Sequence, residues 1–553
     1  MTQRVALLLL LLLATLAMGR SLRNGWIQDD PPLILNNPRV HEVSGLWSGF
    51  TEAYWPPPSQ GGLYRPLARS SATTIWILSG GALWAFRLAG LLLYLVTVVA
   101  VWALARELLA PGQAWVAAAL FAVHPVHTEA VGIAIDQGEL VVALAAAVSV
   151  VAWLRWRRGE LPDGATFGIL GAAYFVALGF KENALILPAL LVATELCIPT
   201  TGAIPPRRRW SIVGGLALFG ALWWSIRAAV LGGLAGAAPA EGLRGVSFGG
   251  RALTMLGVVP EWARLFVWPA HLQGDYSPWE IAPFDQWRVE QTAGLVICIA
   301  FVGALALAWR KHRGVALALL WTALALAPVS NLVIPTGILL AERTLFLASV
   351  GAVIALAALV PESVWSGGRR QVAWGVLGLL LAAGIVKSFT RMATYRDLDA
   401  SIEALAHDAP ASWRTMMIVG IRRMETGHRD EGEQLLAAAH AAWPASPRPI
   451  QLLAFYHRLG GRCADAIPYL EESLKLDAAD SWTRLPYVAC LLDLGRYADA
   501  EAAARAGAGQ DENGVALGHA AAVADSALRV GAAPHTVRLP PIRGGLTLVG
   551  TAP

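Results

Sequence analysis

Eleven apolar segments separated by short polar stretches constrain the fold of this chain more than any other feature. A helix needs about 20 apolar residues to cross the hydrocarbon core of a bilayer, so the shorter segments are expected to be tilted or buried. With 56% hydrophobic and only 15% charged residues among 553, the composition excludes a soluble enzyme and a disordered chain. The sequence therefore predicts an all-α, polytopic membrane bundle, with spans near residues 4–19, 83–104, 114–132, 140–156, 165–180, 184–198, 210–231, 289–308, 315–334, 344–360 and 371–387.

Basic residues predict the orientation of these spans. They cluster on alternate loops, and the positive-inside rule places every cluster in the cytoplasm if the N-terminus is inside. The clusters are Arg155, Arg157 and Arg158; Arg207, Arg208 and Arg209; Arg310, Lys311 and Arg313; and Arg369 and Arg370. Loops 20–82 and 232–287 and everything after about 390 are then extracytoplasmic, in what we expect to be a bacterial inner membrane. The net charge of +4 is small for this length and gives no indication of nucleic-acid binding.

The first apolar segment has two interpretations. One positive charge, an apolar run and small residues fit a cleaved signal peptide, whereas the topology above requires a retained signal anchor. We favour the anchor, because the loop that follows carries an acidic doublet.

The four cysteines show no C-x-x-C spacing, so a cysteine metal site is not expected. Cys197 and Cys298 lie in apolar sequence and are expected to pack as small apolar residues. A disulfide between Cys463 and Cys490 is one possibility, for which the sequence offers no support.

After residue 390 the composition changes to a helical, Ala-rich and charge-rich sequence with a 34-residue period. Gly427, Gly461 and Gly495 recur at this spacing, as do Ala466 and Ala500. The period is typical of tetratricopeptide repeats, which stack into a concave, peptide-holding surface. We expect a membrane domain over 1–390 and a repeat domain over 391–532, with repeats near 411–444, 445–478 and 479–512, a degenerate helix to about 530 and a coil tail over 533–553.

The acidic doublet, Asp29 and Asp30, lies about ten residues past the first apolar segment, on the first extracytoplasmic loop. Pro31 biases Asp30 toward extended backbone, so the pair should sit on a bent loop at the membrane surface. Such a pair alone is a weak indication of function, because most acidic pairs are simply solvated.

Other polar clusters interrupt the apolar sequence at ends predicted to face the same side. Ionisable groups at membrane depth are costly, so clusters that converge favour a functional site. They are Tyr64 and Arg65; His124, His127 and Glu129, continuing to Asp136 and Glu139; Lys181, Glu182 and Asn183; and Asp275 and Tyr276 with Glu342 and Arg343. Simpler interpretations exist for some of them. Lys181 and Glu182 could form a helix-end ion pair, and Arg65 could anchor its loop to lipid headgroups.

The histidine cluster, His124 and His127 with Glu129, resembles a set of metal ligands. However, Pro125 distorts the turn, and no further His or Cys lies nearby. We therefore favour a hydrogen-bonded structural role or a substrate contact for these histidines, and expect no metal.

Six strings occur in order along the chain and together resemble one family. They are Asp-Asp-x-x-x-Ile-x-x-Asn from Asp29, Tyr-Arg-Pro-Leu from Tyr64, His-Pro-Val-His-Thr-Glu-Ala-Val from His124, Lys-Glu at Lys181, Trp-Pro-x-x-Leu-x-x-Asp-Tyr-Ser from Trp268, and Ala-Glu-Arg-x-Leu-x-Leu-x-Ser-Val-Gly from Ala341. Over residues 20–512 the chain resembles the transmembrane and tetratricopeptide-repeat O-mannosyltransferases and their bacterial relatives, within the GT-C superfamily of lipid-dependent glycosyltransferases. It departs from them before the doublet, where the family has Trp-x or Tyr-x, whereas here Gln28 precedes the doublet and Trp26 lies two residues before Gln28. It also departs at Asp136–Leu140, which lacks the family's arginine.

The resemblance implies transfer of a hexose, mannose by analogy, from a polyprenyl-phosphate carrier to a hydroxyl acceptor, with a protein acceptor held by the repeats. It implies that Asp29 is the base and Asp30 its support, or the reverse, and that a single displacement inverts the anomeric centre. No cofactor or metal is required. The residues implied to bind the donor phosphate are Lys181, Arg343 and Arg65, and those implied to contact substrate are His124, His127, Glu129, Glu139, Glu182, Asp275 and Tyr276.

Two other functions stay open. A non-catalytic membrane scaffold, whose repeats recruit partners, predicts that the polar clusters do not converge. A transporter of lipid carriers predicts charges along a path through the bilayer. The enzyme hypothesis predicts instead that Asp29 or Asp30 shares one cavity with Glu129, Lys181 and Arg343. The sequence does not identify the sugar, the lipid length or the acceptor.

Overall fold

The computed structural model describes residues 2–56, 62–199, 204–233, 239–278, 280–333, 335–366, 370–509 and 512–537, and among these it contains helices and no strand. The chain divides into two compact units. The membrane unit contains the residues up to Gly274 and Ala282–Ala404. The repeat unit contains Leu405 onward and also the short segment Asp275–Ile281. The change of unit after Ala404 lies somewhat later than the boundary expected at 390.

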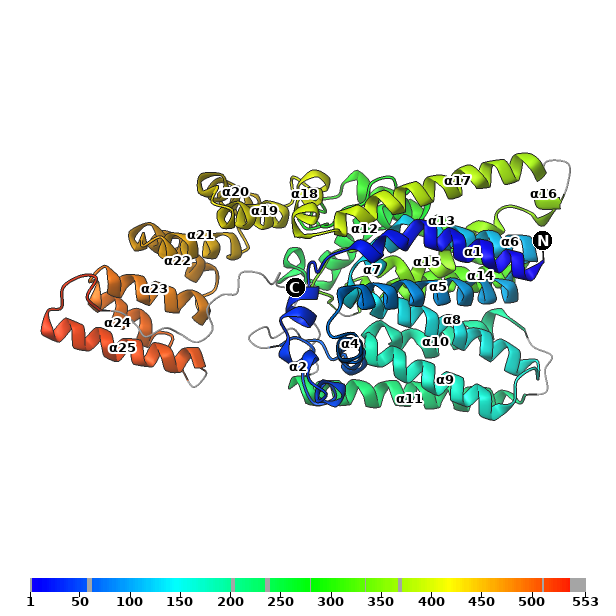
Figure 1. Ribbon diagram of the computed structural model, residues 1–553, viewed down its shortest axis with the longest axis horizontal. Coiled ribbons are helices and arrows are strands. Elements are labelled where there is room, and N and C mark those ends of the chain that lie inside the picture. Colours follow the sequence, from blue (N-terminus) through cyan, green and yellow to red (C-terminus); the bar gives the residue numbers. More distant parts are fainter. Residues whose placement is uncertain are drawn as a thin grey trace. The chain divides into compact units, whose positions relative to one another are not determined.

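Seven helices in the described part of the membrane unit are long and apolar enough to cross a membrane. They run side by side (Figure 1), which confirms the predicted all-α membrane bundle. Their bounds are α1 (Gln3–Met18), α5 (Leu83–Leu108), α8 (Gln137–Arg157), α9 (Asp163–Phe180), α11 (Pro206–Leu231), α13 (Val289–Lys311) and α17 (Arg370–Arg391). Helix α8 is central, because 83% of its apolar stretch is buried, against 11% for α13.

Four of the eleven predicted spans are helices of only 11 to 14 residues, which agrees with the expectation that several segments are too short for a full perpendicular span. They are α6 (Pro111–Val123), α10 (Leu187–Cys197), α14 (Arg313–Leu326) and α15 (Phe346–Ala358). Polar motifs cause this shortening. Helix α6 ends before His124 and Pro125, while α10 and α15 begin after the motifs at Lys181 and Arg343. Single helical turns occupy the remaining length: η3 (Pro125–His127), α7 (Thr128–Gly132), η4 (Ala134–Asp136), η5 (Glu182–Ile186), η7 (Ala327–Val329) and η8 (Glu342–Leu345).

Both long loops of the membrane unit contain helices of their own. The first loop includes η1 (Gly19–Arg23), η2 (Pro31–Leu35), α2 (Pro38–His41), α3 (Gly45–Ser48) and α4 (Pro66–Ser79). The second includes η6 (Glu241–Leu243) and α12 (Phe248–Val267). Outside these loops, two short helices flank α17: α16 (Glu362–Ser366) before it and η9 (Met392–Tyr395) after it.

The repeat unit is a series of helix pairs with the predicted 34-residue period. Gly427, Gly461 and Gly495 each lie in the turn within a pair, with φ of 88°, 72° and 73°. A residue with a side chain is strained in this left-handed conformation, which explains the recurrence of glycine. The pairs are α19 (Trp413–Glu425) with α20 (Arg429–Ala442), α21 (Arg448–Leu459) with α22 (Cys463–Leu476), and α23 (Ser481–Asp493) with α24 (Tyr497–Arg505). Helix α18 (Leu398–Asp408) precedes them, α25 (Glu512–Val530) follows, and residues 538–553 of the expected tail lie outside the described residues.

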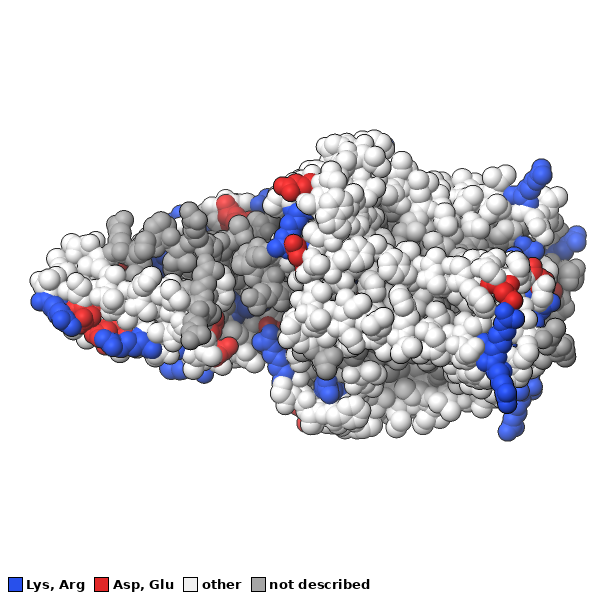
Figure 2. Space-filling model, turned by 90° about the horizontal axis from the view of Figure 1, so that it is seen from below, with Lys and Arg blue, Asp and Glu red and all other residues white. Residues whose placement is uncertain are grey.

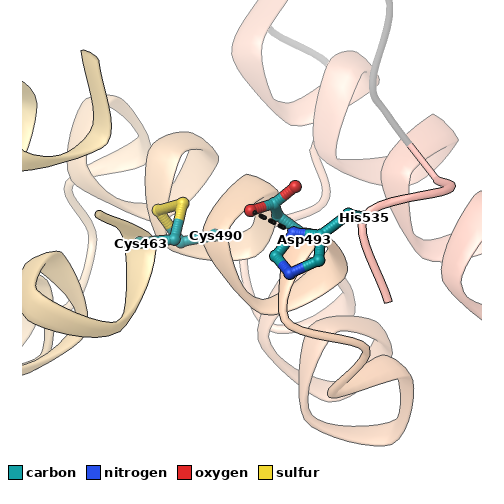
Figure 3. The surroundings of a disulfide bond; sticks show 4 residues. All are labelled: Cys463, Cys490, Asp493 and His535. Atoms are coloured by element: carbon teal, nitrogen blue, oxygen red, sulfur yellow. Dashed lines mark ion pairs between the residues drawn. A yellow bond between two sulfur atoms is a disulfide. The ribbon is translucent and has the colours of Figure 1, made fainter. Parts of the chain in front are cut away.

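A disulfide joins the second and third helix pairs of the repeat unit (Figure 3). It links Cys463 at the start of α22 to Cys490 in α23, with Cα atoms 5.1 Å apart. Near it, His535 from the segment after α25 forms an ion pair of 3.1 Å with Asp493 at the end of α23. The pairing that the sequence left open is thus present in this structure.

Candidate active site

Asp30 is buried within an ion pair. Its carboxylate accepts a hydrogen bond of 2.8 Å from Nη2 of Arg87 on α5, and the two side chains are 0% and 1% exposed. Backbone N–H groups at the start of η4 donate to the same carboxylate, from Ala134 at 3.3 Å and Ile135 at 3.1 Å. Burial raises the pKa of Asp30, although the charge of Arg87 opposes this. Asp30 therefore ties the first loop to α5 and η4.

The backbone at Asp30 differs from the expected extended geometry. Its φ and ψ are −59° and −47°, in the helical region, and one π-helical turn, η2, follows. The bias imposed by Pro31 is outweighed because a helical Asp30 reaches Arg87. The unusual backbone lies two residues earlier, where Gln28 has a φ of 50°. This strained residue turns the chain immediately before the doublet.

Asp29 is only partly buried, in contrast to its neighbour. Its charge acts electrostatically on Arg343 and on Asp136. Of the two aspartates, Asp29 is therefore the one that a substrate can reach.

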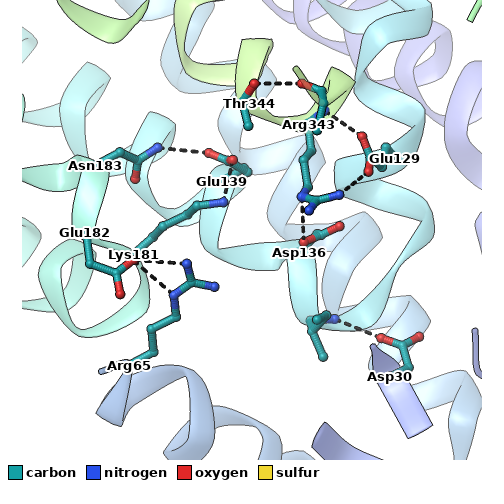
Figure 4. Close-up of polar contacts among 12 residues, drawn as sticks. Asp30, Arg65, Glu129, Asp136, Glu139, Lys181, Glu182, Asn183, Arg343 and Thr344 are labelled. Atoms are coloured by element: carbon teal, nitrogen blue, oxygen red, sulfur yellow. Dashed lines mark hydrogen bonds and ion pairs between the residues drawn. The ribbon is translucent and has the colours of Figure 1, made fainter. Parts of the chain in front are cut away.

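Arg343 holds the centre of this cluster (Figure 4). Its backbone N–H donates to Glu129 Oε2 at 2.8 Å, and its guanidinium also donates to Glu129. Its Nε lies 3.6 Å from Asp136 Oδ1. Burial lowers the pKa of Arg343, but the charge of Glu129 outweighs it and the net pKa is raised. Arg343 is thus a permanent cation with its side chain 24% exposed.

Two further cations stand beside it, each paired with a carboxylate (Figure 4). Lys181 Nζ lies 2.6 Å from Glu139 Oε1, and Asn183 donates to the other oxygen of Glu139 at 3.1 Å. Arg65 Nη2 lies 3.0 Å from Glu182 Oε2. The helix-end pair between Lys181 and Glu182 that the sequence suggested is therefore replaced by two pairs with distant partners.

The carboxylates of these pairs neutralise the cations that they contact. Glu139 is fully buried and Glu129 is nearly so, and both pair with a cation; that they contact substrate stays a prediction. Burial opposes ionisation of Glu182, but the charge of Arg65 outweighs it and holds the pKa of Glu182 below its usual value.

His124 and His127 form hydrogen bonds within the bundle, one of the two roles expected for them, and a substrate contact stays a prediction. The His127 ring nitrogens lie 3.0 Å from the Tyr94 hydroxyl and 2.9 Å from the Ser349 hydroxyl, and the ring is fully buried. His124 Nε2 lies 3.2 Å from the Phe266 carbonyl oxygen, and its Nδ1 accepts from the Val126 N–H. His127 therefore links η3 to α5 and α15, and His124 links the end of α6 to α12. Within the described ranges, no group of three His, Cys, Asp or Glu side chains is placed to hold a metal ion.

Asp275 and Tyr276 belong to the repeat unit. Asp275 accepts hydrogen bonds from the Ser412 and Ser277 hydroxyls and lies 3.5 Å from Arg414. These contacts tie a segment of the second loop to the start of the repeats. Just before this segment, the Gln273 backbone N–H donates to Glu342 Oε1 at 2.6 Å.

Two residues of the cluster received no role from the sequence. Arg87 is the only charge within the segment 83–104, and a lone charge in an apolar span indicates a paired or functional group. Asp136 was recognised only as part of a polar string. Its contact with Arg343 depends on a fold that brings distant segments together, which no local pattern indicates.

Comparisons with known proteins support this picture. Residues 459–522 match the tetratricopeptide repeat family. The chain is 24% identical over 413 residues to mouse (Mus musculus) protein O-mannosyl-transferase TMTC3, an alignment that covers 67% of this chain and 44% of the relative. It is 35% identical over 180 residues to Drosophila melanogaster protein O-mannosyl-transferase Tmtc2, covering 30% of this chain and 19% of that protein.

The chain therefore spans less than half the length of these curated relatives. No solved structure matches it significantly. The sequence matches confirm that this chain resembles the transmembrane and tetratricopeptide-repeat O-mannosyltransferases.

Proposed function

We propose that this protein is a membrane mannosyltransferase that uses a polyprenyl-phosphate sugar and glycosylates a hydroxyl group of a protein. The observation that carries the proposal is a cluster of cations at one end of the bundle, Arg343, Lys181 and Arg65, with the partly exposed Asp29 close enough for its charge to act on Arg343. The names of the relatives support the sugar.

The reaction requires a proton acceptor and an acceptable leaving group. The acceptor oxygen attacks the anomeric carbon while the bond from that carbon to the phosphate oxygen breaks. Asp29 takes the hydroxyl proton, and the polyprenyl phosphate leaves with the bonding electrons. Attack from the side opposite the phosphate inverts the anomeric centre. Asp30 does not take part in proton transfer, because Arg87 and two backbone N–H groups already occupy its carboxylate.

The donor phosphate is held by cations that already have carboxylate partners. Arg343 is the strongest candidate, because it is partly exposed and Asp29 acts on it directly. A planar guanidinium can contact a phosphate and a carboxylate at once, which a lysine ammonium does less well. Lys181 and Arg65 extend the positive surface along the same end of the bundle.

Two features support placing the site outside the cytoplasm. Lys and Arg side chains gather at the end of the membrane unit near the N-terminus (Figure 2), as the positive-inside rule expects of the cytoplasmic end. Helix α9 begins at this end, where Asp163 pairs with Arg208. Lys181 of the candidate site follows the other end of α9. The disulfide in the repeat unit is typical of an oxidising compartment. The repeats then face the same side as the site, where they can hold the acceptor polypeptide.

The proposal is tested with purified full-length protein, a set of polyprenyl-phosphate sugars and an unstructured Ser- and Thr-rich peptide. We expect mannose transfer from a β-linked donor to give an α-linked product. Asp285→Asn is a suitable control for the substitution of Asp29 by Asn. Asp285 is an exposed loop carboxylate whose one ion pair among the described residues is with Arg288. Lipid movement across vesicles without sugar transfer would instead favour a transporter.

A further inference from the structure

Two arginines at the end of the first membrane helix line a cavity that the proposed reaction does not use. The cavity has a volume of about 420 Å³ and is lined by Gly19, Arg20 and Arg23 of η1 and by Phe389 of α17. Arg20 and Arg23 lie in the last turn of the apolar stretch Gln3–Arg23. The site is therefore at the rim of the bundle, where lipid headgroups meet the protein.

Neither arginine has a carboxylate partner among the described residues. In the part of the chain that the structure describes, no carboxylate lies within ion-pair distance of Arg20 or Arg23, and the one charge-dependent contact is Arg20 over the Phe389 ring at 5.1 Å. The cations of the candidate active site, in contrast, each face a carboxylate. Two positive charges thus share one cavity without neutralisation by the protein.

The cavity lies at the same end of the bundle as the doublet. Residue Asn24 follows η1 directly, and its side chain donates to the Gly132 carbonyl oxygen, while Arg87 donates to the Gly25 carbonyl oxygen. Basic clusters that follow the positive-inside rule lie at the opposite end. Membrane orientation therefore does not account for Arg20 and Arg23.

Apolar surface continues from the cavity along both helices. Leu12 and Leu16 of α1 are 52% and 48% exposed, and they precede Arg20 at intervals of four residues. Val386 of α17, one turn before Phe389, is 62% exposed. A ligand that matches this surface has an anionic head and an apolar chain directed into the bilayer.

We propose that the cavity binds an anionic phospholipid, with its phosphodiester between Arg20 and Arg23 and an acyl chain along the exposed leucines of α1. Charge complementarity and the continuous apolar surface select this occupant over a soluble phosphate ion. The proposal does not depend on the transferase activity. The lipid holds the start of the loop that carries Asp29 and Asp30 at the level of the headgroups.

The test is native mass spectrometry of the full-length protein from nanodiscs containing equal phosphatidylglycerol and phosphatidylcholine. We expect wild-type protein to retain phosphatidylglycerol selectively. Arg20→Gln with Arg23→Gln should reduce its affinity about 30-fold, from the usual contribution of two basic residues near an anionic surface. The charge-conserving pair Arg20→Lys with Arg23→Lys should keep most of the binding.

Arg4→Gln is the matched control, because Arg4 is an exposed cation at the opposite end of α1. The proposal is overturned if the double Gln variant retains phosphatidylglycerol like wild type, or if Arg4→Gln loses as much. It is also overturned if added polyprenyl phosphate displaces the phospholipid in wild type, since the cavity would then be a donor site, or if inorganic phosphate does so.

Discussion

At the scale of single residues, the two adjacent aspartates occupy different environments. Asp30 is enclosed by Arg87 and two backbone N–H groups, whereas Asp29 is partly exposed and faces Arg343. The doublet and its neighbouring basic motifs could be predicted from local strings. The different burial of Asp29 and Asp30 could not be predicted, because it depends on contacts between distant segments. Arg87 lies 57 residues from Asp30, and Glu129 lies 214 residues from Arg343. The burial that separates the two carboxylates arises only when these segments meet.

The buried pair gives a first prediction. Asp30→Leu or Arg87→Met alone leaves one buried charge without its partner, and each should lower the free energy of unfolding by about 3–5 kcal/mol. The double variant should recover part of that loss, since no charge then stays buried. Thermal unfolding of the four proteins in the same detergent measures this. Additive losses in the double variant would contradict a direct pair.

The pair between Arg65 and Glu182 gives a prediction on pH. The pKa of Glu182 is lower in the folded protein than its usual value of 4.5, so ionised Glu182 stabilises the fold above that value. This stabilisation is lost as the pH falls through the folded pKa. The stability difference between wild type and Glu182→Gln should therefore be constant near neutrality and shrink below pH 4.5. A difference that stays constant to lower pH would rule out the ion pair as its source.

At the scale of elements, polar motifs determine where the apolar helices stop. Apolar runs predicted the positions of the spans, but not that α6, α10 and α15 are short. Helix α6 is short for a local reason, because Pro125 follows its last residues. Helices α10 and α15 are short for a non-local reason: Lys181 and Arg343 pair with distant carboxylates, and these pairs hold the single turns that precede α10 and α15. The shortened helices make room for the polar cluster within the bundle.

The glycine turns of the repeats give a prediction at this scale. Gly461 has a φ of 72° with open space at its Cβ position, whereas Gly460 has a φ of −82°. Gly461→Ala should cost about 1–2 kcal/mol through backbone strain alone. Amide hydrogen exchange in α21 and α22 should then be about 5- to 30-fold faster if opening is local. Gly460→Ala is the control and should leave exchange unchanged. Equal effects at both positions would refute the strain explanation.

At the scale of the whole molecule, the proposed orientation rests on two separate features, the basic loops and the Cys463–Cys490 disulfide. The 34-residue period predicted the helix pairs, because each repeat is defined by neighbours in sequence. The placement of Asp275 in the repeat unit was not predictable, since a loop string gives no information on which unit it packs with.

Orientation gives the prediction at this scale. In sealed cells, a membrane-impermeant maleimide should label a cysteine introduced at Leu459, a repeat residue that is 71% exposed, without lysis. Cys197 is buried in α10 and should stay unlabelled in the folded protein. Labelling of Leu459→Cys that requires lysis would place the repeats in the cytoplasm.

The account depends most on Asp29 as the base, and the direct measurement compares Asp29→Asn with Asp30→Asn in one transfer assay. We predict that Asp29→Asn lowers kcat by about 10²- to 10⁴-fold, the usual contribution of a general base, and keeps the wild-type Tm. Asp30→Asn should instead lower Tm, because Arg87 loses its charged partner. Wild-type kcat in Asp29→Asn, with the loss of turnover in a fully folded Asp30→Asn, would contradict the account.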